Sequence, residues 1–210
     1  MRPLGWLLPC LALVAAAAVG AGAAEPPPDC SGPGGDRPSR CLYRSALPSA
    51  GFVAECASDH DCRVGYYYGA PERATWFAPP PEMARLPKPQ VRWLTATFAE
   101  ARFPCGRECA WSYFFEAKRQ LLSAPRRDVL AADYRRLLMA QVDGRALAIR
   151  QIFSARQVLR LVRDWAPGLS IREAITEIHF DPDGRLTLTW LKGPARERVS
   201  ERISVPSFAR

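Results

Sequence analysis

Histidine is scarce in this chain of 210 residues, and the short motifs of common catalytic centres are missing. The two histidines, His60 and His179, lie far apart in the sequence. A serine–histidine–aspartate triad needs a histidine beside an activated serine, and neither G-x-S-x-G nor S-x-x-K occurs. The C-x-x-C spacing of redox and zinc sites is also missing. The sequence therefore predicts no catalytic residue, no metal ligand and no cofactor.

Long apolar runs are lacking as well, except at the N-terminus. Residues 4–19 are almost entirely apolar, with Arg2 before them and the small residues Ala21 and Ala23 after them. This order is typical of a secretion signal, because a signal peptidase needs a charge, a short apolar helix and small side chains at the cleavage site. We predict that residues 1–23 are a signal peptide. A retained anchor is the alternative, but the run is short for a span and contains a proline.

Lysine is rare, whereas arginine is abundant. Only three of the 29 basic residues are lysines, and the formal net charge of the chain is +8. The arginines are scattered and form no basic stripe, so nucleic acid is excluded as the expected partner. The charge predicts a salt-sensitive attraction to acidic proteins or to anionic polymers of the cell envelope.

Cysteine, by contrast, follows the pattern of an exported protein. One of the seven cysteines lies in the predicted signal, which leaves an even number for the mature chain. An even count predicts disulfides, and six cysteines allow 15 connectivities. Because of their proximity in the sequence, we expect the last two to pair with each other and the other four among themselves. The disulfide cysteines are Cys30, Cys41, Cys56, Cys62, Cys105 and Cys109.

Proline-rich stretches divide the chain. Residues 25–40 and 78–90 are rich in proline, which breaks helices and strand ladders alike. We therefore predict a small cysteine-rich module with a flexible start at 24–77, a linker at 78–90 and an antiparallel β domain at 91–210. The first module is too small to bury a sufficient core alone, so it should depend on its disulfides.

Strand patterns prevail after residue 90. Apolar residues alternate on both sides of Asp143-Gly144, which is a strong hairpin signal, and residues 181–184 (D-P-D-G) predict a second turn, with a third strand over 196–205. Residues 155–165 show helical spacing, with a strand as the alternative. The predicted fold is mainly β (α+β): an antiparallel meander or sandwich with hairpins, one short covering helix and a disulfide-stapled N-terminal segment.

Two hairpin stretches resemble the blades of β-propellers. Residues 128–152 and 175–193 each contain an apolar strand, a D-G turn and an alternating strand. Neither has a WD or kelch motif, and the residues after the second proline-rich stretch would make fewer than three blades of about 40–45 residues each. A closed propeller is therefore not expected.

Aromatic residues gather in one short segment, and this segment is the predicted contact surface. Three consecutive tyrosines between Gly65 and Gly69 cannot all point inward from one strand. Such rings can stack on sugars or anchor a protein, although they could equally supply core for a small module. The predicted ligand- or partner-binding residues are Tyr66, Tyr67, Tyr68 and Trp76.

Other polar clusters are weaker candidates. Asp59, His60 and Asp61 could hold a divalent metal, but neighbouring residues of a tight loop point in different directions, so a solvated loop is the preferred interpretation. The expected function is that of an exported, non-enzymatic protein that binds a partner protein or an anionic envelope polymer. The alternative is a hydrolase of envelope polysaccharide or peptide that uses paired carboxylates, and Glu100, Glu116 and Glu177 lie on predicted strands.

Overall fold

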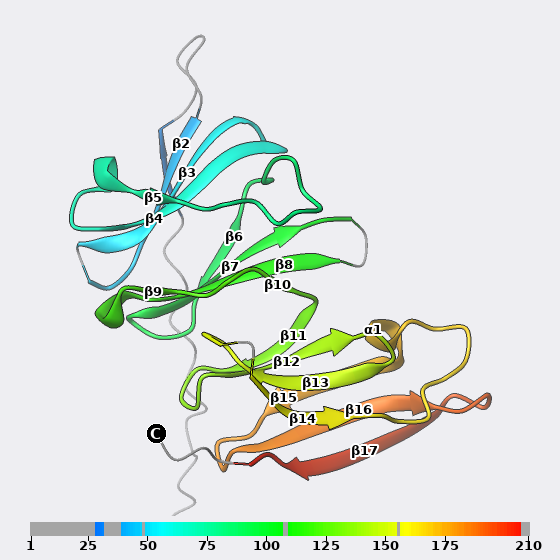
Figure 1. Ribbon diagram of the computed structural model, residues 1–210. Coiled ribbons are helices and arrows are strands. Elements are labelled where there is room, and N and C mark those ends of the chain that lie inside the picture. Colours follow the sequence, from blue (N-terminus) through cyan, green and yellow to red (C-terminus); the bar gives the residue numbers. More distant parts are fainter. Residues whose placement is uncertain (1–27, 32–38, 48, 107–108, 155, 207–210) are drawn as a thin grey trace, which may run out of the picture.

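Four antiparallel sheets, here named A to D in chain order, stack face to face in a computed structural model of the chain (Figure 1). Each sheet is built from strands that follow one another in the sequence, so short turns supply most of the connections. The predicted signal peptide lies outside the described part of the chain, which comprises residues 28–31, 39–47, 49–106, 109–154 and 156–206.

Sheet A contains the first five strands, in sequential order. The Cys30–Cys41 disulfide joins paired residues of the first two strands, and Cys56–Cys62 joins paired residues of the next two. The strands are β1 (Asp29–Ser31), β2 (Ser39–Arg44), β3 (Ala50–Ser58), β4 (Asp61–Tyr68) and β5 (Thr75–Trp76), with the 3-10 turn η1 (Pro71–Arg73) before β5.

Sheet B follows the second proline-rich stretch. Its strands are ordered β10-β8-β7-β6, and β9 pairs with β8. A third disulfide, Cys105–Cys109, closes the turn between β7 and β8, so the predicted grouping of the six cysteines is confirmed. The elements are β6 (Gln90–Trp93), β7 (Phe98–Pro104), β8 (Ala110–Glu116), the 3-10 turn η2 (Ala117–Arg119), β9 (Leu121–Leu122) and β10 (Arg126–Arg127).

Sheet C is a four-stranded meander whose second hairpin contains the predicted Asp143-Gly144 turn. Asp143 pairs with Ala146, so the two-residue loop is Gly144-Arg145, and Gly144 has a φ of +61°. The hairpin is confirmed, with its loop one residue later than predicted. The strands are β11 (Val129–Asp133), β12 (Leu138–Asp143), β13 (Ala146–Gln151) and β14 (Gln157–Leu161).

The helix predicted over residues 155–165 is wrong, because this segment contains strand β14. Short apolar runs fit either period, and here pairing with β13 satisfies the backbone while Leu159 and Leu161 pack against sheet D. The short helix lies a few residues later, where Ser170 and Glu173 exchange side-chain and backbone hydrogen bonds in a capping box.

Sheet D ends the described chain and carries that helix at its start. Residues 181–184 form the predicted turn, with Gly184 at a φ of +87°, and the predicted third strand is present. The elements are α1 (Ile171–Ala174), β15 (Ile175–Phe180), β16 (Arg185–Lys192) and β17 (Glu197–Ser204). The mainly β, antiparallel architecture with a single short helix among the described residues agrees with the predicted fold class.

Three hydrophobic clusters fill the spaces between neighbouring sheets. Sheets A and B share the first, sheets B and C the second, and sheets C and D the third. Alternate residues of β7 and β8 therefore face opposite cores, with Phe103 and Phe115 toward sheet A and Phe98 and Phe114 toward sheet C. Among the described residues no cluster joins sheets A and D, so the stack is open (Figure 1).

The proline-rich stretch at 78–90 lies against sheet A. The amide of Cys62 donates to the carbonyl of Leu86 (2.7 Å), and the amide of Lys88 donates to the carbonyl of Asp59 (2.8 Å). Leu86 is buried in the cluster between sheets A and B. The stretch contributes to the shared core, while the division into separate domains at this point stays a prediction.

Gly144 should be hard to replace. A Cβ there would meet no atom within 4 Å, so the cost of substitution comes from the positive φ alone. We expect Gly144→Val to lower the free energy of unfolding by about 1 kcal/mol or more in urea denaturation. The control is Arg145→Ala, which changes the neighbouring exposed turn residue and should alter stability little. An unchanged Gly144→Val midpoint would contradict the turn geometry.

Buried tyrosines should make the fold sensitive to alkali. Burial raises the pKa of Tyr113 to about 12, and its hydroxyl donates to the carbonyl of Ala78 (2.6 Å). Unfolded tyrosine ionises near pH 10, so the folded state should lose stability as the pH rises from about 10 to about 12. Tyr113→Phe should be less stable at pH 8 but lose less between pH 9 and 11. Equal losses for both proteins, measured by denaturant titration, would refute this.

Candidate functional site

The predicted aromatic contact surface is only partly at the surface. Tyr67 is buried, Tyr66 packs against Phe77 and Phe115 in the core between sheets A and B, and Tyr68 is 48% exposed. Of the three consecutive tyrosines, therefore, one points freely to solvent. Partner binding by these residues stays a prediction.

Trp76 and Tyr67 lie on the outer face of sheet A, where they cover two glycines. A Cβ on Gly51 would come within 2.7 Å of the Tyr67 hydroxyl, and one on Gly65 would lie 3.0 Å from the Trp76 ring. The guanidinium of Arg63 lies over the Trp76 ring, 3.9 Å from its centroid. Both rings are therefore used for packing, and Arg63 partly screens Trp76 from solvent.

The polar residues considered in the sequence lie at separate places in the fold. Asp59 and His60 form the exposed turn between β3 and β4, and Asp61 pairs with Arg85. His179 lies on the outer face of sheet D, where its two ring nitrogens approach Glu177 (3.5 Å) and Asp181 (3.2 Å). Within the described ranges, no group of three or more His, Cys, Asp or Glu side chains is arranged to hold a metal ion.

Glu100 is the most deeply buried of the candidate carboxylates, with 4% of its surface exposed. Its two oxygens accept from the Ser112 hydroxyl (2.6 Å) and from Arg92 (2.9 Å). A pocket of about 490 Å³ lies beside it and has Glu100 as its only carboxylate. Glu116 instead caps η2, and Glu177 belongs to sheet D. Glu100 and Glu116 lie on the neighbouring strands β7 and β8, where their carboxylates have different partners.

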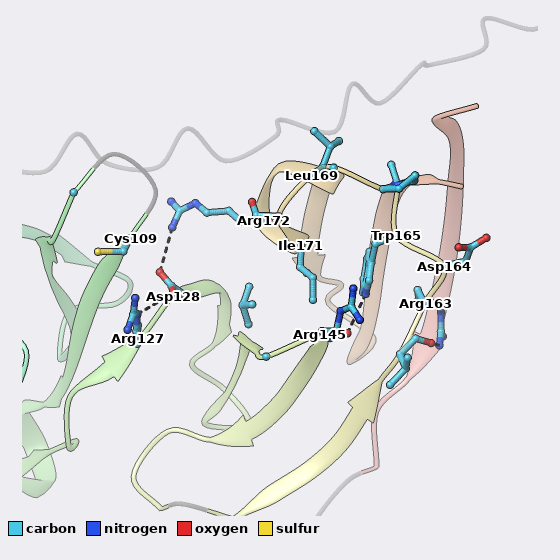
Figure 2. A pocket seen from close by; sticks show the side chains of 18 residues that line it. Cys109, Arg127, Asp128, Arg145, Arg163, Asp164, Trp165, Leu169, Ile171 and Arg172 are labelled. Carbon is cyan, nitrogen blue, oxygen red and sulfur yellow. Dashed lines mark hydrogen bonds and ion pairs between the residues drawn. The ribbon is translucent and has the colours of Figure 1, made fainter. Parts of the chain in front are cut away.

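One pocket was not predicted from the sequence. It has a volume of about 760 Å³, and Figure 2 shows Arg127 and Asp128 on one side with Trp165, Arg145 and Arg163 on the other. Its walls come from the Cys105–Cys109 turn, the end of β10, the tip of the β12–β13 hairpin and the segment from Val162 to Arg172. The pocket thus lies along one side of the stack, where strand ends and turns of sheets B, C and D come together.

Asp128 anchors one wall. It has a φ of +53°. Its backbone amide donates to the carbonyl of Ala110 in β8 (2.8 Å), and its carboxylate accepts from the amide of Ala110 (3.2 Å). Its carbonyl accepts from the amide of Val142 in β12 (3.2 Å). The carboxylate also forms ion pairs with Arg127 (3.3 Å) and Arg172 (3.7 Å). Asp128 therefore ties sheet B to sheet C and to α1.

Backbone hydrogen bonds hold the opposite wall. Ala166 donates to the carbonyl of Leu191 in β16 (2.9 Å), and Gly193 donates to that of Asp164 (3.2 Å). The indole N–H of Trp165 donates to the carbonyl of Arg145 (3.2 Å), and its ring packs edge-on against Trp190. The segment after β14 is thus fixed to both sheets C and D, which makes the pocket a preformed feature.

Arginine determines the electrostatics of the pocket. Its lining contains four arginines and two aspartates and has no lysine or glutamate. Arg163 donates twice to Glu201 (3.1 and 2.9 Å), and Arg127 bonds Glu82 (2.7 Å) as well as Asp128. Arg145, at the hairpin tip, is exposed and forms no ion pair with any described residue. An exposed cation at the rim of the pocket favours an anionic ligand.

Sequence reasoning missed this pocket because its parts are separated along the chain. The four arginines come from β10, from a hairpin loop, from the segment after β14 and from α1. Their spacing carries no motif, and the wrong helix over 155–165 concealed the connecting segment. The nearest signal in the sequence was Arg145 itself, which directly follows the Asp143-Gly144 hairpin signal.

No family model matches this chain, and neither the curated proteins nor the solved structures contain a match to it. In the part of the chain that the structure describes, none of the helices has the length and apolar character needed to cross a membrane.

The Tyr67 hydroxyl should be dispensable. It is buried and has no hydrogen-bond partner among the described residues. Burial raises the pKa of Tyr67 above its ordinary value and outweighs the positive charge of Arg44, which acts in the opposite direction. We expect Tyr67→Phe to raise the free energy of unfolding by up to about 1 kcal/mol, because a buried unpaired polar group is removed. Tyr113→Phe removes a bonded hydroxyl and should do the reverse. A clear loss of stability in Tyr67→Phe would show that its hydroxyl has a partner.

Proposed function

We propose that this protein is exported and binds an anionic partner at the arginine-lined pocket, without turning over a substrate. The observation that carries the proposal is Arg145, an exposed cation at the rim of the pocket that forms no ion pair with a described carboxylate. Ion pairs hold Arg127, Asp128, Arg163 and Arg172 in place, so an anionic ligand would meet a prepared site.

Three features of the pocket support binding rather than catalysis. Asp128 is engaged by two guanidiniums and a backbone amide, so it serves to hold the walls together. The second acidic residue, Asp164, belongs to the segment fixed on sheet D. The lining contains no histidine, lysine or free thiol that could act as base or nucleophile. The hydrolase alternative thus lacks an evident acid–base pair in the described pocket.

Export is supported by the cysteines. All six cysteines of the predicted mature chain form disulfides, which persist in oxidising compartments such as the periplasm or the extracellular space. The partners available there include acidic proteins and anionic envelope polymers. The excess of arginine would strengthen the encounter with either, most of all at low salt.

The binding test uses the mature protein with two polyanions, polygalacturonate and heparin, and with neutral dextran as the negative control. We expect Arg145→Gln to weaken polyanion binding about tenfold, because a charge-assisted contact is lost. The matched control is Arg73→Gln, which removes an equal charge from the exposed turn η1 on sheet A and should have little effect. Asp128→Asn keeps an acceptor for Ala110 and should tighten binding about threefold.

The same titrations distinguish the competing interpretations. Equal losses in Arg145→Gln and Arg73→Gln would mean that net charge, and not the pocket, governs binding. A loss confined to Tyr68→Ala would place the contact on the aromatic segment instead. Release of reducing ends from polygalacturonate by the wild type would overturn the non-enzymatic part of the proposal.

A further inference from the structure

Strand β14 forms an open edge of sheet C that leads into the pocket. Sheet C is ordered β11-β12-β13-β14, so within the described residues one side of β14 pairs with β13 and the other side has no neighbouring strand. An edge of this kind presents backbone N–H and C=O groups to which another strand can bond. The next residue, Val162, is 64% exposed and lines the pocket.

The charged residues of the edge segment itself all have one sign. Residues 156–163 (RQVLRLVR) contain three arginines and no acidic residue, and Arg163 is bonded to Glu201 of β17. The edge strand β17 of sheet D, by contrast, carries both glutamate and arginine. Pairing between two copies of β14 would gather like charges at one sheet edge, which is unfavourable. A second copy of this chain is therefore a poor occupant, whereas an acidic strand is complementary.

Arg160 is the cation best placed to meet such a strand. Its side chain is 51% exposed and lies 4.0 Å from Asp143, which is already bonded by Arg150 at 2.6 Å. Arg160 pairs with Ala148 of β13. On the far side of β14, a residue of an added strand would stand directly beside Arg160, about 5 Å away between Cβ atoms. A glutamate or aspartate at that position would gain an ion pair.

We propose that the partner is an extended acidic polypeptide segment, which adds to sheet C as a strand along β14 and reaches the arginine-lined pocket at Val162. This inference rests on the proposed function and specifies its ligand. Both backbone pairing and apolar contact favour a peptide over a glycan, because the edge offers a row of peptide groups and the pocket lining includes apolar side chains such as Val142, Val162 and Ile171.

The test measures the binding of a fluorescein-labelled octapeptide of alternating glutamate and threonine by anisotropy. Two modified peptides carry N-methyl groups on either the odd or the even residues. They keep the side chains and charge but lose the amide donors of one strand edge. We expect the unmodified peptide to bind and at least one N-methylated peptide to bind at least tenfold more weakly. A lysine–threonine octapeptide should not bind.

Matched variants locate the contact. Arg160→Gln should weaken binding of the acidic peptide about threefold to tenfold, as expected for the loss of one ion pair at a partly exposed site. Arg198→Gln removes an exposed arginine from the edge strand β17 and should leave the affinity nearly unchanged. In hydrogen exchange, the amides of β14 should become protected when the peptide is added, while those of β17 should not.

Failure of this inference is separable from failure of the proposed function. If both N-methylated peptides bind as tightly as the parent, strand addition is wrong, although the pocket could still hold an anion. If polygalacturonate binds in an Arg145-dependent manner and the peptide does not bind, the ligand is a glycan and the inference is overturned. If neither binds, both the inference and the proposed function fail.

Discussion

Burial of sheets B and C on both faces is the constraint on which the rest of the structure depends. Because both faces of each sheet are covered, polar and apolar residues do not alternate along the strands. The strands β8 and β13 are therefore apolar along most of their length. Sheets A and D cover the outer faces of this pair. Each inner sheet thus has a neighbouring sheet on both sides that buries its apolar residues. Removal of either outer sheet would expose a hydrophobic cluster.

A stack held together by its faces leaves its ends and edges available for function. Connections between the strands of sheets B, C and D come together along one side of the stack. Asp128 and Trp165 fix them there through hydrogen bonds to neighbouring strands. The polar and charged groups of the arginine-lined pocket therefore lie outside the packed layers. The open edge of β14 runs into the same region, which unites the two proposed contact elements in one surface.

Local features of the chain were predictable, because each depends on a few adjacent residues. The turns at Gly144 and Gly184 could be predicted because glycine accepts the positive φ that these turns require. The Cys105–Cys109 pairing could be predicted because the two cysteines are close in the sequence. The helix over 155–165 was wrong because its short apolar run suits either period, and the pairing of β14 with β13, set by distant residues, decides the outcome. The pocket could not be predicted, because the elements that surround it meet only after the sheets have stacked.

The central claim is that an anionic partner binds where sheets B, C and D meet. The most direct measurement is a titration of ¹⁵N-labelled mature protein with polygalacturonate or an acidic peptide, followed through the arginine side-chain and backbone resonances. The account predicts that the largest shifts fall on Arg145, on Arg160 and on the backbone from Val162 to Arg172. Shifts centred on Tyr68 and β5, or spread evenly over all exposed arginines, would contradict it.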